Sequence, residues 1–114
     1  MELVRMEIEQ IAQATTGQRT NQLWHRMREK RLTGSCFGRA LRAATSRNSN
    51  AVEEFRKEIF TPRNLTHIPA IKWGTDHEAV ALAAYVELTG YKVRETGLWL
   101  MPNGYLGASP DGLV

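Results

Sequence analysis

The sequence has little cysteine: Cys36 is the single one among 114 residues. No internal disulfide can form, which favours a reducing compartment. One cysteine and three scattered histidines give no zinc-site spacing. A Gly-rich loop of the kind that cradles a nucleotide phosphate is also absent. These absences argue against a disulfide scaffold, a zinc module and a P-loop enzyme.

Long apolar runs are missing as well, and none approaches the ~20 residues that cross a membrane. The first residues include Glu2, Glu7 and Glu9 and no apolar stretch, which is unlike a secretory signal. We expect an intracellular protein, cytoplasmic or nuclear, that is neither secreted nor membrane-bound. The length fits one small domain or part of a larger one.

Basic residues are unevenly distributed along the chain, although its net charge is only +3. Between positions 19 and 47 a single acid, Glu29, accompanies eight basic residues: Arg19, Arg26, Arg28, Lys30, Arg31, Arg39, Arg42 and Arg47. Such a stripe attracts polyanions, of which nucleic acid is the usual one. A solvated helical face fits the same pattern, and charge alone does not separate the two interpretations.

Apolar residues at helical spacing predict four short helices in the first half of the chain. They are expected over residues 2–14, 21–30, 36–46 and 51–60. Thr20, Ser35 and Asn50 suit the N-caps of the last three, because short polar side chains accept from free helical N–H groups. We expect Trp24 to pack in a core, and Cys36 to be a small buried residue. A turn is expected over 61–64.

The second half of the chain begins with the longest predicted helix, from near Pro69 to a C-terminal Gly90. One face of it is expected to pack closely against a sheet: Ala79, Leu82, Ala83 and Val86. Small alanines on that face would allow the close approach.

Strand composition follows the long helix over residues 91–101, with a bulge or bend expected at Gly97. Pro102-Asn103-Gly104 favours a hairpin turn, and 105–108 is the expected return strand. Two strands seldom form a stable sheet alone. We therefore expect the apolar residues Trp99, Leu100 and Leu113 to need a further strand or a partner beside them.

Two carboxylates stand at positions that suggest metal chemistry. Glu78 lies in the first half of the long predicted helix, and Asp111 follows the hairpin within Ser109-Pro110-Asp111-Gly112. Brought together by the fold, they could hold a hard cation such as Mg²⁺, which activates water at a scissile phosphate. Taken singly, a helical glutamate is usually a surface charge, and Asp-Gly is usually a turn.

Together these segments resemble the lambda exonuclease and YqaJ viral recombinase family, within the PD-(D/E)xK nuclease superfamily. That family shows Trp-Gly with a glutamate four residues after the glycine, as in Trp73-Gly74 and Glu78. A helix, a Thr-Gly-like turn, an extended segment and Ser-Pro-Asp-Gly then follow, as they do here. The resemblance implies an α+β fold with a restriction-endonuclease-like core. It also implies that Glu78 and Asp111 are catalytic ligands of Mg²⁺ or Mn²⁺.

A second match lies upstream, where the family carries Trp-His, an arginine three residues later, and Thr-x-Ser. This chain has Trp24-His25, Arg28 and Thr33-Gly34-Ser35. The resemblance implies that Arg28 and Ser35 bind the 5′-phosphate of a DNA end, and we assign Thr33 and Arg31 to the same DNA-binding group. An arginine fork and a helix start both favour phosphate. On spacing alone, the favoured interpretation is that Ser35 is only an N-cap and Arg28 only a solvated cation.

The printed chain departs from the family where it ends, since Val114 precedes the position of the family's Glu-x-Lys. We therefore expect one partial nuclease domain over 1–114, with weak metal binding and poor catalysis. Residues 1–68 would be its helical, phosphate-binding part. Residues 69–114 would be the long helix and the hairpin that carry the metal ligands.

The expected function is a metal-dependent exonuclease acting on DNA ends in recombination or viral DNA processing. Its expected partner is double-stranded DNA with a 5′-phosphate, and self-association or a partner chain is expected at the incomplete sheet edge. The alternative is a non-catalytic DNA-binding module, or a half-site that a partner completes. A small helical interaction domain with a chance motif is the third interpretation.

Overall fold

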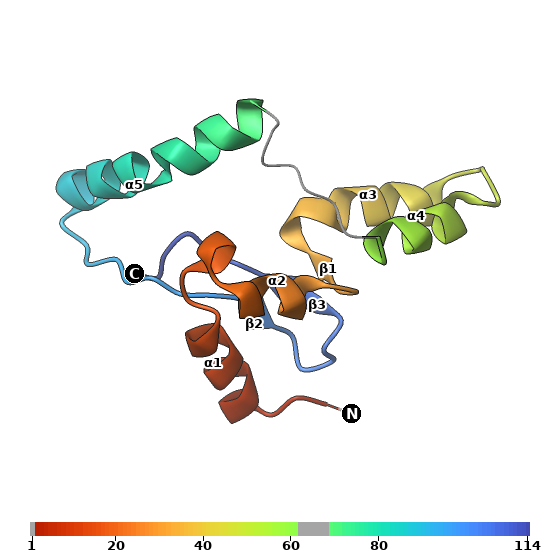
Figure 1. Ribbon diagram of the computed structural model, residues 1–114, viewed down its shortest axis with the longest axis horizontal. Coiled ribbons are helices and arrows are strands. Elements are labelled where there is room, and N and C mark those ends of the chain that lie inside the picture. The colour runs from red at the N-terminus through yellow and green to blue at the C-terminus, as the bar shows by residue number, and fades with distance from the viewer. Residues whose placement is uncertain (1, 62–68) are drawn as a thin grey trace.

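The computed structural model of the protein describes residues 2–61 and 69–114. Its helices are α1 (Arg5–Ala14), α2 (Gln22–Arg28), α3 (Gly34–Thr45), α4 (Ala51–Ile59) and α5 (Pro69–Thr89), with a 3-10 turn, η1 (Gln18–Thr20). Its strands are β1 (Leu32–Thr33), β2 (Trp99–Leu100) and β3 (Leu106–Ala108). This composition confirms the α+β class (Figure 1). The turn expected over 61–64 lies outside the described residues from Pro62 on.

The three strands form one mixed sheet in the order β1-β3-β2. β1 runs parallel to β3, and β2 runs antiparallel to it, with Leu100 opposite Gly107. The expected hairpin turn is confirmed, because Gly104 adopts a positive φ of 77° and its N–H donates to the Met101 carbonyl at 2.9 Å. β1 is not predicted above, since two residues are too few to give an alternating pattern.

The expected strand over 91–101 is wrong in extent. Only Trp99–Leu100 pair with β3, and Arg94 makes an isolated bridge with Leu113. The cause is visible between these two pairings, where the backbone N–H of Leu98 donates to Thr15 Oγ1 at 2.8 Å instead of to a strand. The segment therefore docks on the end of α1, below the sheet in Figure 1.

A small core lies where α1 and α2 meet β2. Trp24, Leu98 and Leu100 are buried there, with Leu3, Ile11 and Met27 packed against them. The prediction that Trp24 packs in a core is confirmed. The expectation that Leu100 needs a further strand or partner is wrong, because its side chain is covered by the chain itself and is 4% exposed.

Gly97 allows the close docking of α1 on this core. A Cβ at that position would lie 2.1 Å from Thr15 Oγ1 and 2.6 Å from the Ala12 carbonyl oxygen. The expected bulge or bend at Gly97 is thus a site of close backbone approach, where a side chain has no room.

Helix caps differ from the sequence-based expectation by one or two residues. Asn21 rather than Thr20 caps α2, and its Oδ1 accepts from the Leu23 N–H at 2.9 Å. Thr33 rather than Ser35 is the N-cap of α3, because the helix begins directly after β1. Asn50 is the N-cap of α4, as expected, although its side chain makes no capping bond.

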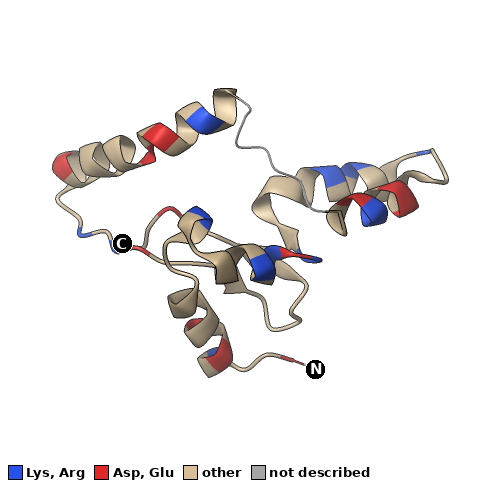
Figure 2. Cartoon of the chain, viewed as in Figure 1, with Lys and Arg blue, Asp and Glu red and all other residues tan. Residues whose placement is uncertain are grey.

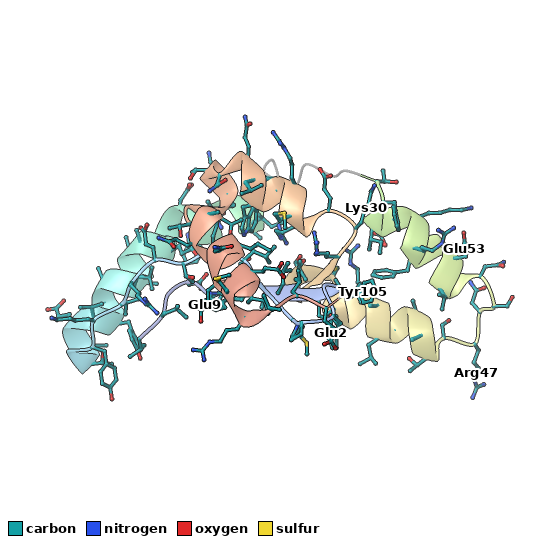
Figure 3. The ribbon with its side chains drawn as sticks, turned by 90° about the horizontal axis from the view of Figure 1, so that it is seen from below. Glu2, Glu9, Lys30, Arg47, Glu53 and Tyr105 are labelled. Carbon is teal, nitrogen blue, oxygen red and sulfur yellow. The ribbon has the colours of Figure 1, made fainter. Side chains whose placement is uncertain are left out.

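Helix α5 has the expected bounds but not the expected packing. Gly90 ends it with a positive φ of 71°. The prediction of a close-packed face is wrong, because Ala79, Ala83 and Val86 are exposed and Leu82 is only half-buried. The reason is that α1 and α2 cover the sheet, so α5 lies away from it, at the opposite end of the molecule from the α3–α4 pair (Figures 1 and 3).

This arrangement gives an extended molecule of 50 × 37 × 25 Å. Its radius of gyration is 16.1 Å, whereas about 13 Å is typical of a compact domain of this length. In Figure 3 Arg47 lies at the tip of the α3–α4 pair and Glu53 lies on α4. Over the described ranges, 2–61 and 69–114, no helix combines the length and apolarity needed to cross a membrane.

Candidate metal and phosphate sites

The fold brings together the two carboxylates that the sequence singles out. Glu78 lies on α5 and Asp111 in the loop after β3, and their carboxyl groups are close enough to shift each other's pKa. Two open hollows, of about 670 and 480 Å³, are both lined by this pair. The carboxylates are thus adjacent and reachable from solvent.

A hydrogen bond between the two carboxyls shifts their pKa values in opposite directions. It raises the pKa of Asp111, and burial and the negative charge of Glu78 raise that pKa further. It lowers the pKa of Glu78, which also accepts a hydrogen bond from Arg19. The pattern is that of two acids close enough to repel when both are ionised.

Arg19 is a member of this site that the sequence analysis does not identify. Its Nη2 lies 2.6 Å from Oε2 of Glu78, so η1 contacts α5 through an ion pair. The signal in the sequence is weak, since Arg19 is simply the first residue of the basic stripe.

Gln18, also missed by sequence reasoning, fixes the loop that carries Asp111. Its amide nitrogen donates to the Pro110 carbonyl at 2.7 Å and to the Thr96 carbonyl at 3.2 Å. Gln18 has a positive φ of 47°, which is uncommon for a residue with a side chain. No pattern in the sequence predicts such a long-range contact.

Gly112 brings the Asp111 loop close to its neighbours. A Cβ at Gly112 would lie 2.3 Å from Val93 Cγ1 and 3.7 Å from Leu82 Cδ2 of α5. The glycine of the Ser-Pro-Asp-Gly motif therefore permits a close approach beside the carboxylate pair.

The donor set fits a hard divalent cation. Mg²⁺ is commonly held by one or two carboxylates, and waters and substrate phosphates complete its octahedron. Glu78 and Asp111 supply carboxylates of this kind on an open surface. Among the residues that the structure describes, no group of three or more His, Cys, Asp or Glu is arranged to hold a metal.

Arg28, Thr33 and Ser35 form a second cluster, at the start of α3. Arg28 Nη2 donates to Ser35 Oγ at 3.0 Å and to Thr33 Oγ1 at 3.2 Å. Ser35 is the second residue of α3, where free N–H groups and the helix dipole favour an anion. Three of the predicted phosphate-binding residues thus lie within hydrogen-bonding distance of one another.

The guanidinium of Arg28 lacks a charged partner in this cluster. Burial lowers its pKa below the ordinary value, because the cation loses hydration. Its Nε is buried and has no hydrogen-bond partner among the described residues. A desolvated cation whose polar contacts are neutral hydroxyls favours an added anion.

The side chain of Arg31 makes structural contacts with backbone carbonyls rather than with the hydroxyls of this cluster. Its Nε donates to the Gly104 carbonyl at 2.9 Å, and its Nη1 donates to the Met27 carbonyl at 2.7 Å. It therefore joins the end of α2 to the hairpin turn. The predicted DNA contact of Arg31 stays a prediction.

The basic stripe follows η1, α2, the turn after it and α3, where the blue segments of Figure 2 gather. Some of its cations make specific contacts within the protein: Arg19 pairs with Glu78, and Arg39 pairs with Glu58 of α4. The stripe is thus more than a uniformly solvated helical face.

Comparison with known proteins gives one family match. The family model described as the YqaJ-like viral recombinase domain matches residues 23–114. Neither the curated proteins nor the solved structures give a match. The matched range contains the Arg28 cluster, Glu78 and Asp111, whereas Gln18 and Arg19 precede it.

Proposed function

The chain belongs to the YqaJ-like viral recombinase domain family, and we propose that it is a metal-dependent deoxyribonuclease domain acting on DNA ends. The observation that carries this proposal is the adjacency of Glu78 and Asp111, which come from two separate elements and line the same two open hollows. The proposed setting is DNA recombination or viral DNA processing. The proposed core is restriction-endonuclease-like, with residues 1–68 and 69–114 as two parts of one domain.

The proposed chemistry places Mg²⁺ or Mn²⁺ on the carboxylates of Glu78 and Asp111. A bound cation of this kind supplies a Lewis acid at the scissile phosphate and lowers the pKa of a water. The carboxylates would hold it on the open surface, where a DNA backbone can approach. Gln18 keeps the Asp111 loop in place through the Pro110 carbonyl.

Substrate positioning is assigned to the Arg28 cluster. We propose that Arg28 donates to the terminal 5′-phosphate, with Ser35 and Thr33 beside it, and that Arg31 supports this region from the hairpin side. The partly desolvated guanidinium of Arg28, whose Nε has no hydrogen-bond partner among the described residues, supports this role. Cations along η1, α2 and α3 would attract the duplex over a longer range.

The experiment is digestion of linear duplex DNA carrying 5′-phosphate, with Mg²⁺, with Ca²⁺ or with EDTA. Progressive loss of DNA that requires Mg²⁺ and disappears in Asp111→Asn and Glu78→Gln supports the nuclease. Asp76→Asn, on the same helix, is the matched control and should retain the activity. Digestion that survives both ligand substitutions would show that these carboxylates are not the metal site.

A second candidate is a non-catalytic DNA-binding module, or a half-site that a second chain completes. The observation in its favour is α5, whose large apolar residues Ile71, Trp73, Val80 and Leu88 are all exposed. Salt-sensitive DNA binding without Mg²⁺-dependent loss would favour this function. Light scattering with and without DNA would then report whether a second copy covers α5 or the sheet edge.

A further inference from the structure

The ion pair between Arg19 and Glu78 places a protein cation at the proposed metal site. Arg19 Nη2 lies 2.6 Å from Glu78 Oε2, and the side chains are 41% and 28% exposed. Arg19, Glu78 and Asp111 also line the same two open hollows, so the guanidinium lies beside both carboxyls. The guanidinium therefore takes the position of counter-ion to the pair.

The backbone at Arg19 is held by neighbours on both sides. Nε2 of His25 donates to the Arg19 carbonyl at 2.8 Å, which ties η1 to α2. Gln18, the preceding residue, bonds the Pro110 carbonyl next to Asp111. One short turn thus contacts both carboxylate-bearing segments, which makes the ion pair more than a contact between two free surface side chains.

We propose that Arg19 is the resident counter-ion of the Glu78–Asp111 pair, and that a divalent cation must displace its guanidinium in order to bind. The inference rests on the proposed metal site and adds a residue outside the family match. Its basis is electrostatic. Two adjacent carboxylates need a proton or a cation beside them, and two cations cannot share that position without repulsion.

Displacement of the Arg19 guanidinium would change the protein surface as well as the affinity for the metal. Without metal, Arg19 satisfies Glu78 and holds α5 against η1. A bound metal would release the guanidinium of Arg19, which lines both open hollows. Arg19 should therefore lower the affinity for the metal compared with a neutral residue at the same position.

The test is calorimetric titration of the full chain with MgCl₂ or MnCl₂ after EDTA treatment. Arg19→Gln should bind about fivefold more tightly, the upper range for one partly exposed ion pair. Arg19→Lys keeps the charge and should stay close to the unchanged protein. Arg26→Gln removes an exposed arginine of α2 and controls for net charge.

A second measurement follows the unchanged protein, and the variant Arg19→Lys serves only to identify the signal. The Arg19 guanidinium signal in ¹⁵N NMR, identified by its loss in Arg19→Lys, should move as Mg²⁺ saturates the protein. A signal that stays in place at saturation would overturn the proposal. So would Arg19→Gln binding metal no more tightly than Arg26→Gln.

These results separate the inference from the proposed function. If Asp111→Asn leaves metal binding unchanged, the metal site itself is wrong and Arg19 has no such role. If Asp111→Asn abolishes binding while Arg19→Gln leaves it unchanged, the metal site stands and only the counter-ion role is wrong.

Discussion

The indole Nε1 of Trp24 donates a hydrogen bond of 2.9 Å to Oγ of Ser109. The face of the same ring lies 4.1 Å from the guanidinium carbon of Arg28. One buried side chain therefore contacts both the phosphate cluster and the Ser-Pro-Asp-Gly loop that carries Asp111. The two proposed sites are parts of one packed unit, although their residues lie far apart in the sequence.

The bond between Trp24 and Ser109 should contribute measurably to stability. Ser109→Ala leaves the Trp24 N–H without its acceptor, in a residue only 6% exposed. An unpaired buried donor costs about 1–3 kcal/mol, so urea unfolding should show a loss in that range. Ser49→Ala, at an exposed loop position, should have almost no effect. Equal stability of the two variants would show that the bond is not formed in solution.

The Arg28 cluster predicts selectivity for the chemistry of the DNA end. Arg28→Ala should lower affinity for 5′-phosphorylated duplex about tenfold or more, because it removes a charge-assisted contact of about 1.5–3 kcal/mol. Affinity for 5′-hydroxyl duplex should change much less. Fluorescence anisotropy in EDTA, which prevents cleavage, measures both.

Two comparisons sharpen this test of end selectivity. Arg28→Lys should recover little of it, since an ammonium lacks the planar fork. Arg31→Ala should lower stability, because Arg31 bonds two carbonyls, while keeping the preference for phosphate. Equal losses for both DNA ends in Arg28→Ala would contradict the phosphate assignment.

Gly97 should tolerate no side chain. Gly97→Ala introduces a Cβ at 2.1 Å from Thr15 Oγ1 and 2.4 Å from the Thr15 carbonyl carbon. Relief requires moving the end of α1, which should cost about 1–3 kcal/mol in urea unfolding. Gly38→Ala is the matched control, since nothing lies within 4 Å of its added Cβ in α3. That change should stabilise the helix by about 0.5–1 kcal/mol.

The sequence predicts the helical segments and the hairpin because their signals are local. Periodic apolar residues define the helices, and Asn103-Gly104 defines the turn at which Gly104 adopts a positive φ. Local signals do not predict β1, because its two residues acquire strand geometry only through pairing with β3. The packing of α5 is predicted wrongly for the complementary reason. An apolar face shows that a helix can pack against a sheet, but it does not show whether other helices, here α1 and α2, already cover that sheet.

The residues of the candidate site also differ in whether the sequence alone can identify them. Glu78, Asp111, Arg28 and Ser35 are found through motif resemblance, and the fold places them in two clusters. Gln18 and Arg19 escape because their roles depend on contacts with residues more than fifty positions away. Glutamine after Gly17 is also an unusual choice for a positive φ, and only the structure shows what its side chain reaches.

Gln18 yields the most specific prediction for the geometry of the Asp111 loop. Its amide is a donor to two carbonyls, those of Thr96 and Pro110. Gln18→Glu replaces the donor by a carboxylate of similar shape, which accepts only and would face two acceptors. The loop should then shift, with weaker Mg²⁺ binding by calorimetry and a stability loss of about 1–3 kcal/mol.

Comparison with other substitutions separates the lost bonds from the added charge. Gln10→Glu, at an exposed position of α1, adds the same charge and should leave metal affinity almost unchanged. Gln18→Gly removes both bonds but relieves the positive φ, so it should lose metal affinity with a smaller loss of stability than Gln18→Glu. If both Gln18 variants bind Mg²⁺ as the unchanged protein does, Asp111 is positioned by Gly112 and the sheet rather than by Gln18.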